Sequence, residues 1–110
     1  MTYDDFIASL ESASCPPSLD SYQQALWYDA KGDWDKAHRI VQAIDDPTAA
    51  RIHAYLHHVE GDDWNSKYWH RMAGSEFPEH LSLEEEWDML VGEEKWTPQF
   101  GQPLKWPLPV

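Results

Sequence analysis

The residues with the clearest chemical potential are His53, His57 and Glu60, in the segment IHAYLHHVEG. Successive residues of an α-helix turn by about 100°, so these three side chains would fall within about 60° of one another. Two His four residues apart on a helix have the spacing that binds zinc. A metal site is therefore one interpretation of this pattern, with Glu60, His38 or His70 as the third ligand. The alternative is a polar helix flank whose His side chains bond to solvent or to neighbours.

Acid–base and nucleophilic chemistry finds weaker support. General-base catalysis needs a His beside a carboxylate, and Asp29, Tyr55, His57 and His58 offer such pairs. A chain with 6 His and 20 acidic residues offers many such pairs by chance. The single cysteine, Cys15, precedes two prolines and has no basic neighbour in the sequence that would activate its thiol. No glycine-rich phosphate loop or serine nucleophile motif is present, so we expect no catalytic residue and no cofactor.

Tryptophan is the most unusual feature of the composition, with 7 Trp among 110 residues. Trp34 and Trp64 each begin the second helix of a predicted hairpin, which favours a packing role for both. Trp27 and Trp69 lie off the apolar stripes of their helices. They could cover a neighbouring hairpin, or they could line a groove and anchor a partner, because aromatic anchors dominate binding energies.

Apolar periodicity, capping residues and helix breakers predict how these side chains are positioned. We predict an N-terminal helix within residues 1–14, helical hairpins over 18–45 and 46–74, and a short helix over 82–92. The Pro- and Trp-rich segment 93–110 is predicted to be an extended tail. No segment reads as a confident strand, so the expected fold is a single all-α domain.

Glycine followed by aspartate marks the turn of each predicted hairpin. Gly32 suits the left-handed end of one helix, and Asp33 can cap the next. Gly61 repeats this role, followed by Asp62 or Asp63 as the cap. Further predicted N-caps are Thr2, Ser18, Asp46 (followed by Pro47) and Ser82.

The two hairpins also look alike in sequence. An offset of 29 residues aligns Ala25 with Ala54 and Ala37 with Ser66. These are small residues at the points where the two helices of a hairpin would approach each other. Internal similarity of this kind indicates stacked helical repeats.

The segment GDWDKA at 32–37 resembles the turn of tetratricopeptide repeats, and the pattern covers about residues 19–78. The chain is also similar to a family of small bacterial proteins. The offset of 29 residues between the two hairpins is shorter than the tetratricopeptide period of about 34 residues. The resemblance implies stacked hairpins with a concave face that grips a peptide or helix.

The charge bounds the class of partner. The chain has 20 acidic and 8 basic residues and a net charge of −12, so binding to nucleic acid or to an anionic membrane is disfavoured. A basic partner is favoured. The opening MTYDDFIASL lacks the features of a secretory signal, and no stretch approaches the ~20 apolar residues of a membrane helix. We expect a cytoplasmic protein.

These patterns favour a non-catalytic protein–protein interaction module that binds a basic or amphipathic segment. Two alternatives stay open: a metal-binding protein or metal-dependent enzyme that uses His53 and His57, and an acidic mimic of nucleic acid that inhibits a DNA- or RNA-binding protein. The tail would either cap the fold or occupy a binding groove. The expected partner contacts are Trp27, Tyr28, Asp29, His57, His58 and Trp69.

Overall fold

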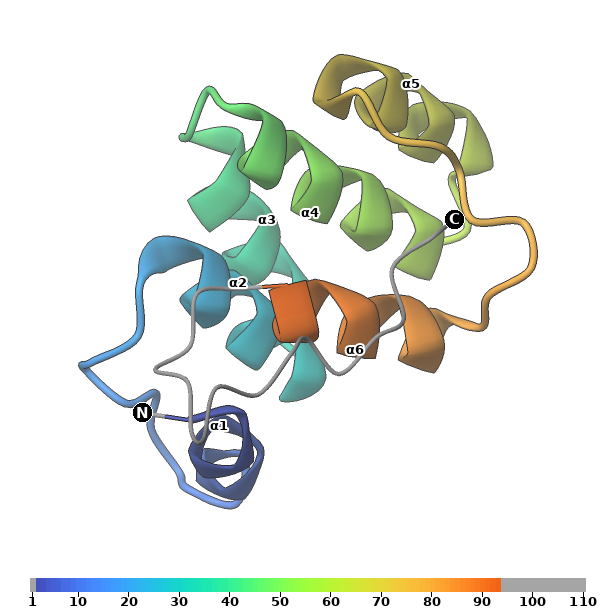
Figure 1. Cartoon of the computed structure of the whole chain (residues 1–110). Helices are drawn as coiled ribbons and strands as arrows, with labels where there is room; N and C mark the ends of the chain where they lie inside the picture. Colours follow the sequence, from blue (N-terminus) through green and yellow to red (C-terminus); the bar gives the residue numbers. More distant parts are fainter. Residues whose placement is uncertain (1, 94–110) are drawn as a thin grey trace.

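The computed structural model describes residues 2–93 of the chain, and this part is helical, with no strand among the described residues. The all-α prediction is therefore confirmed for the described part, and the predicted tail lies outside it apart from Glu93. Figure 1 shows α4 crossing the middle of the molecule, with α5 on one side and α2, α3 and α6 around the other. The helices are α1 (Tyr3–Ser9), α2 (Ser21–Ala30), α3 (Trp34–Gln42), α4 (Pro47–Val59), α5 (Asp63–Ala73) and α6 (Leu83–Glu93).

Most helix starts follow from local capping. The side chains of Asp33, Asp46 and Asp62 each accept a hydrogen bond from the backbone N–H three residues later, as predicted. Thr2 forms its predicted capping box. The cap predicted at Ser18 is wrong, because Asp20 caps α2 through a reciprocal pair of hydrogen bonds with Gln23. Carboxylate caps of this kind satisfy backbone donors that the helix leaves unpaired.

The two hairpin turns are built in the same way. Gly32 and Gly61 have φ values of 87° and 83°, in the left-handed region where a side chain would be strained. After each glycine, an aspartate N–H donates to a carbonyl five residues earlier: Asp33 to Tyr28 at 2.8 Å, and Asp62 to His57 at 2.9 Å. This is the hydrogen-bond pattern of a Schellman helix end.

Small residues let the helices of each hairpin pack closely. Ala25, Ala37, Ala54 and Ser66, the residues that the 29-residue offset aligns, are all fully buried. Between α4 and α5, the Ser66 hydroxyl donates to the carbonyl of Ala54 at 2.7 Å. A polar residue is thereby accommodated at the crossing without an unpaired group.

α4 is the centre of the core, because it packs against α2, α3, α5 and α6. Its buried Ile52 and Leu56 join Phe6 of α1, Leu26 of α2 and Val41 of α3 in one apolar cluster. The N-terminal helix ends at Ser9, earlier than predicted, before the two prolines of the following loop. Among residues 2–93, no helix combines the length and apolarity needed to cross a membrane.

The matching roles predicted for Trp34 and Trp64 are only half right. Trp34 packs against the core and donates from its indole nitrogen to the carbonyl of Leu56 at 2.6 Å. Trp64 is 72% exposed and stacks on Tyr68, so its predicted role in the core is wrong. The difference arises because α3 is covered by the following α4, whereas this face of α5 is not covered by another described helix.

Candidate metal centre

Three His side chains from two helices meet beside α4. His53 and His57 lie one turn apart on α4, as predicted, and His38 reaches them from α3. One ring nitrogen of each lies within 4.8 Å of the other two. The Nε2 atoms of His38 and His53 are 2.9 Å apart, so one ring donates a hydrogen bond to the other. We call His38, His53 and His57 the histidine cluster.

The sequence offered three candidates for the third ligand. Two of them lie at the histidine cluster and one lies elsewhere. His38 is a full member of the histidine cluster. Glu60 lies next to it, with Oε1 2.6 Å from Nδ1 of His57. His70 lies elsewhere, since its Nδ1 is 2.7 Å from the hydroxyl of Ser75 and its Nε2 faces Glu86 of α6.

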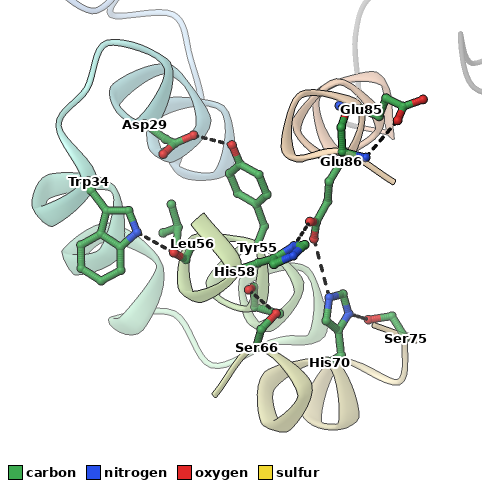
Figure 2. Close-up of polar contacts among 12 residues, drawn as sticks. Asp29, Trp34, Tyr55, Leu56, His58, Ser66, His70, Ser75, Glu85 and Glu86 are labelled. Carbon is green, nitrogen blue, oxygen red and sulfur yellow. Dashed lines mark hydrogen bonds and ion pairs between the residues drawn. The ribbon is translucent and has the colours of Figure 1, made fainter. Parts of the chain in front are cut away.

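Two tryptophans hold the rings of the cluster in place. The indole of Trp34 stacks on His38, with centroids 4.8 Å apart and an interplanar angle of 13°. The indole of Trp69 stacks on His53 at 4.0 Å and 14°. Trp34 is itself anchored by its bond to the Leu56 carbonyl, which Figure 2 shows. The aromatic walls limit the movement of the imidazoles and exclude water from one side of each ring.

Burial favours the metal-binding, neutral form of His53 and His38. His53 is only 5% exposed, and burial, with the neighbouring His38 and His57, lowers its pKa to about 4. Burial also lowers the pKa of His38, and the neighbouring His57 lowers it further. The negative charges of Glu60 and Asp35 oppose this shift without cancelling it. A neutral imidazole has one free nitrogen lone pair, so these two rings can ligate a metal at neutral pH without a net loss of a proton. The ring that donates from Nε2 would first shift its hydrogen to Nδ1.

Glu60 defines the orientation of His57. A carboxylate only accepts, so Nδ1 of His57 carries the hydrogen that it shares with Glu60. In the neutral ring, the lone pair of His57 is then on Nε2. A carboxylate bonded to the far nitrogen of a ligating His is the usual outer-sphere partner in zinc sites, where it fixes the ring and makes it more basic.

The spacing of the cluster is close to what zinc needs. In a tetrahedral site with Zn–N bonds of about 2.0–2.1 Å, ligand nitrogens lie about 3.3 Å apart. The 2.9 Å between His38 and His53 needs to widen by only a few tenths of an ångström. The nitrogen of His57 lies no more than 4.8 Å from the other two, so binding needs a shift of at most about 1.5 Å there.

The residues expected to contact a partner do not share one surface. Trp27 is 2% exposed and packs in the core, where its indole nitrogen donates to the Ser9 hydroxyl at 3.1 Å. Tyr28 is half-buried under the ammonium group of Lys36. Asp29 faces Tyr55 on the far side of α4. The other three are divided between two sites. His57 is in the histidine cluster and Trp69 stacks on its His53, whereas His58 bonds to Glu86.

The sequence reasoning missed a second polar cluster, which Figure 2 shows at the junction of α4, α5 and α6. Glu86 is 2% exposed, and its Oε1 accepts from Nδ1 of His58 at 2.7 Å. Its Oε2 is 3.7 Å from Nε2 of His70. One signal was available: Glu86 lies three residues after Leu83 and four before Leu90, on the apolar face of its helix.

No family model, curated protein or solved structure matches this chain, so its function is inferred from the chemistry of its own residues.

Proposed function

We propose that this protein binds one divalent transition-metal ion, with zinc as the best match, through His38, His53 and His57. The observation that carries the proposal is the convergence of three imidazole nitrogens from α3 and α4 within 4.8 Å. Imidazole is a preferred ligand of Zn²⁺, Cu²⁺, Ni²⁺ and Fe²⁺. The buried, neutral state of His53 and the Glu60 carboxylate behind His57 both support this role.

Three protein ligands would leave one position of a tetrahedral ion open to water or to another ligand. Closed structural zinc sites use four protein ligands, whereas sites with three His keep an exchangeable position. We therefore favour an accessible metal site over a purely structural one. An accessible metal site agrees with the metal-binding alternative from the sequence. The geometry supports this site better than it supports the expected partner-binding surface, because Trp27 of that surface is buried in the core.

We also infer that the two hairpins are a pair of tetratricopeptide-like repeats. The matching hydrogen bonds after Gly32 and Gly61 support this, as do the small buried residues at both helix crossings. In such repeats the side chains of neighbouring helices build a shared surface. The histidine cluster would then be a site on the surface shared by the second helix of one repeat and the first helix of the next.

The test is a Zn²⁺ titration of the metal-free protein in competition with a chromogenic chelator. We expect one Zn²⁺ per chain. His38→Gln and His57→Gln each remove one ligand from a partly exposed position, so we expect each to weaken binding by at least about 100-fold. Glu60→Gln removes an outer-sphere partner, and such changes weaken binding by about 10- to 100-fold.

His80→Gln is the matched control, because His80 is an exposed loop residue outside the histidine cluster. It should bind Zn²⁺ like the wild type. Zn²⁺ should also raise the melting temperature of the wild type and of His80→Gln, because a ligand that binds only the folded state stabilises it. Equal Zn²⁺ affinity in the wild type, His38→Gln and His57→Gln would refute the proposal.

A further inference from the structure

A second site lies on the opposite side of α4 from the histidine cluster. Tyr55 lies two residues after His53, and Val59 lies two residues after His57. At 100° per residue, each therefore points about 160° away from the cluster His that precedes it. They line an open groove of about 720 Å³ that is bounded by α2, α4, α6 and the loop end of α1. We call it the acidic groove.

The surface of the acidic groove is largely apolar. Leu10, Val59, Leu83 and Trp87 contribute its hydrophobic wall. The indole nitrogen of Trp87 donates to the carbonyl of Leu26 at 3.0 Å, which fixes this ring against α2. Leu83, the first residue of α6, remains 37% exposed. This wall can take up apolar side chains of a ligand.

The charges around the groove have one sign. Its lining residues include four carboxylates and no Lys, Arg or His. Asp29 accepts a hydrogen bond from the Tyr55 hydroxyl at 2.7 Å, as Figure 2 shows, and its burial raises its pKa. Glu84 is exposed in the first turn of α6. The other two carboxylates belong to Glu85, which caps α6 together with Ser82, and to Asp88, which accepts a hydrogen bond from the Tyr3 hydroxyl.

The shape of the groove argues for a polypeptide ligand. Small-molecule pockets of about 300–1,000 Å³ normally enclose 70–90% of their ligand, but this groove is largely open to solvent. An amphipathic helix laid in an open groove buries only its apolar face and keeps its polar flanks at the rim. The four carboxylates of the lining match Lys or Arg on those flanks, which favours encounter and orientation.

We propose that the acidic groove binds a basic amphipathic helical segment of another protein. The apolar face of the segment would pack on Val59, Leu83 and Trp87, and its basic flank would face Asp29 and Glu84. The site is separate from the metal centre, so loss of Zn²⁺ binding would leave it intact.

The test uses a fluorescein-labelled 18-residue helix of leucine and lysine, with its leucine–glutamate counterpart as the control probe, and measures anisotropy with the full chain. We expect the leucine–lysine probe to bind and the leucine–glutamate probe not to bind. Asp29→Asn and Glu84→Gln should each weaken binding about three- to tenfold, because each removes a charge contact of the size expected near a protein surface. Leu83→Ser should weaken it by a similar factor through lost apolar contact.

Matched variants separate the groove from general acidity. Glu79→Gln changes the net charge as Glu84→Gln does, in an exposed loop outside the groove lining. Met72→Ser removes an apolar residue of α5 that is 58% exposed. Both should bind the leucine–lysine probe like the wild type. Equal weakening by Glu79→Gln and Glu84→Gln, or unchanged binding in Leu83→Ser, would overturn the proposal.

Two other occupants of the acidic groove would give distinct results, and either result would overturn the proposal. If residues 94–110 of the same chain fill the groove, the double variant Lys95→Glu/Lys105→Glu should bind the leucine–lysine probe more tightly than the wild type. If a second copy fills it, sedimentation velocity should show a dimer that Leu83→Ser disrupts. We expect neither gain of affinity nor such a dimer.

Discussion

At the scale of single residues, Asp29 shows how the fold accepts a local cost. Its carboxylate is largely buried beside the Tyr55 hydroxyl, and burial raises its pKa above the ordinary value of 3.8. The hydrogen bond from Tyr55 opposes this shift without cancelling it. A carboxylate that must ionise in such a place destabilises the folded state at neutral pH. An aspartate at this position is understandable if its negative charge serves to bind a cationic group in the acidic groove.

We predict that Asp29→Asn makes the protein more stable at pH 7. The folded carboxyl binds its proton more tightly than the unfolded one, so the stability of the wild type falls as the pH rises through the folded-state pKa. Asparagine keeps an oxygen to accept from Tyr55 and has no charge to bury. Urea unfolding of both proteins between pH 7 and pH 4 checks this, and the advantage of the variant should shrink as the pH falls. A constant difference across that range would contradict it.

At the scale of helices, the α4–α5 crossing depends on two small residues in contact. Ser66 and Ala54 are fully buried, and the Ser66 hydroxyl donates to the Ala54 carbonyl. At the equivalent crossing of the first hairpin, Ala25 and Ala37 pack without such a bond. Close packing of this kind leaves no room for added methylene groups.

We predict that Ser66→Ala lowers the free energy of unfolding by about 1 kcal/mol, the usual value of one hydrogen bond. Ser66→Leu should cost about 1–3 kcal/mol more, because the larger side chain forces the helices apart. Chemical denaturation measures both. Exposed Lys67, next in sequence, is the control position, and Lys67→Leu should change stability little. Similar losses from Ser66→Leu and Lys67→Leu would show that the crossing is not closely packed.

The attachment of α6 depends on a buried charge. Glu86 projects from α6 toward His58 of α4 and His70 of α5, and it joins three helices at one carboxylate. A buried carboxylate is tolerated only when neighbouring groups donate to it. Removal of one donor leaves the charge behind, which costs more than removal of both partners together.

We predict that His58→Phe lowers stability by about 2–4 kcal/mol, because Oε1 of Glu86 loses its donor in a buried site. Phenylalanine keeps the ring contact of His58 with Phe77. In the double variant His58→Phe/Glu86→Leu, the uncompensated charge is gone, and more than 1 kcal/mol of the loss should be regained. A double-mutant cycle measures this coupling. Additive losses from the two changes would show that the two side chains act independently.

At the scale of the whole molecule, the net charge of −12 acts on every conformation. Like charges repel more strongly in the compact state than in the extended chain, so excess charge opposes folding. Salt screens this repulsion over distances of about 10 Å at 0.1 M ionic strength. The same charge supports the proposed preference of the acidic groove for basic partners.

We predict that raising the ionic strength from about 0.01 M to about 0.15 M increases the urea concentration at the unfolding midpoint, since screening relieves the repulsion. NaCl and KCl should act alike, because the effect depends on ionic strength. The same salt change should weaken binding of the leucine–lysine probe. A midpoint that falls with salt would indicate that attractive ion pairs outweigh the overall repulsion.

The sequence alone determined the local features of this protein. Helix ends at Gly32 and Gly61, caps at Asp33, Asp46 and Asp62, and the small residues at the crossings were all predictable, because capping and left-handed turns depend on a few neighbouring residues. The i,i+4 spacing of two cluster His was predictable for the same reason.

Only the tertiary structure decided which distant side chains meet. It chose His38 over His70 as the third member of the histidine cluster, and it buried Trp27 while leaving Trp64 exposed. It also carried Glu86 into the interior between helices that lie far apart in the sequence. These outcomes depend on how α3, α5 and α6 pack around α4, and helix packing is set by the fit of whole surfaces rather than by the identity of any one residue.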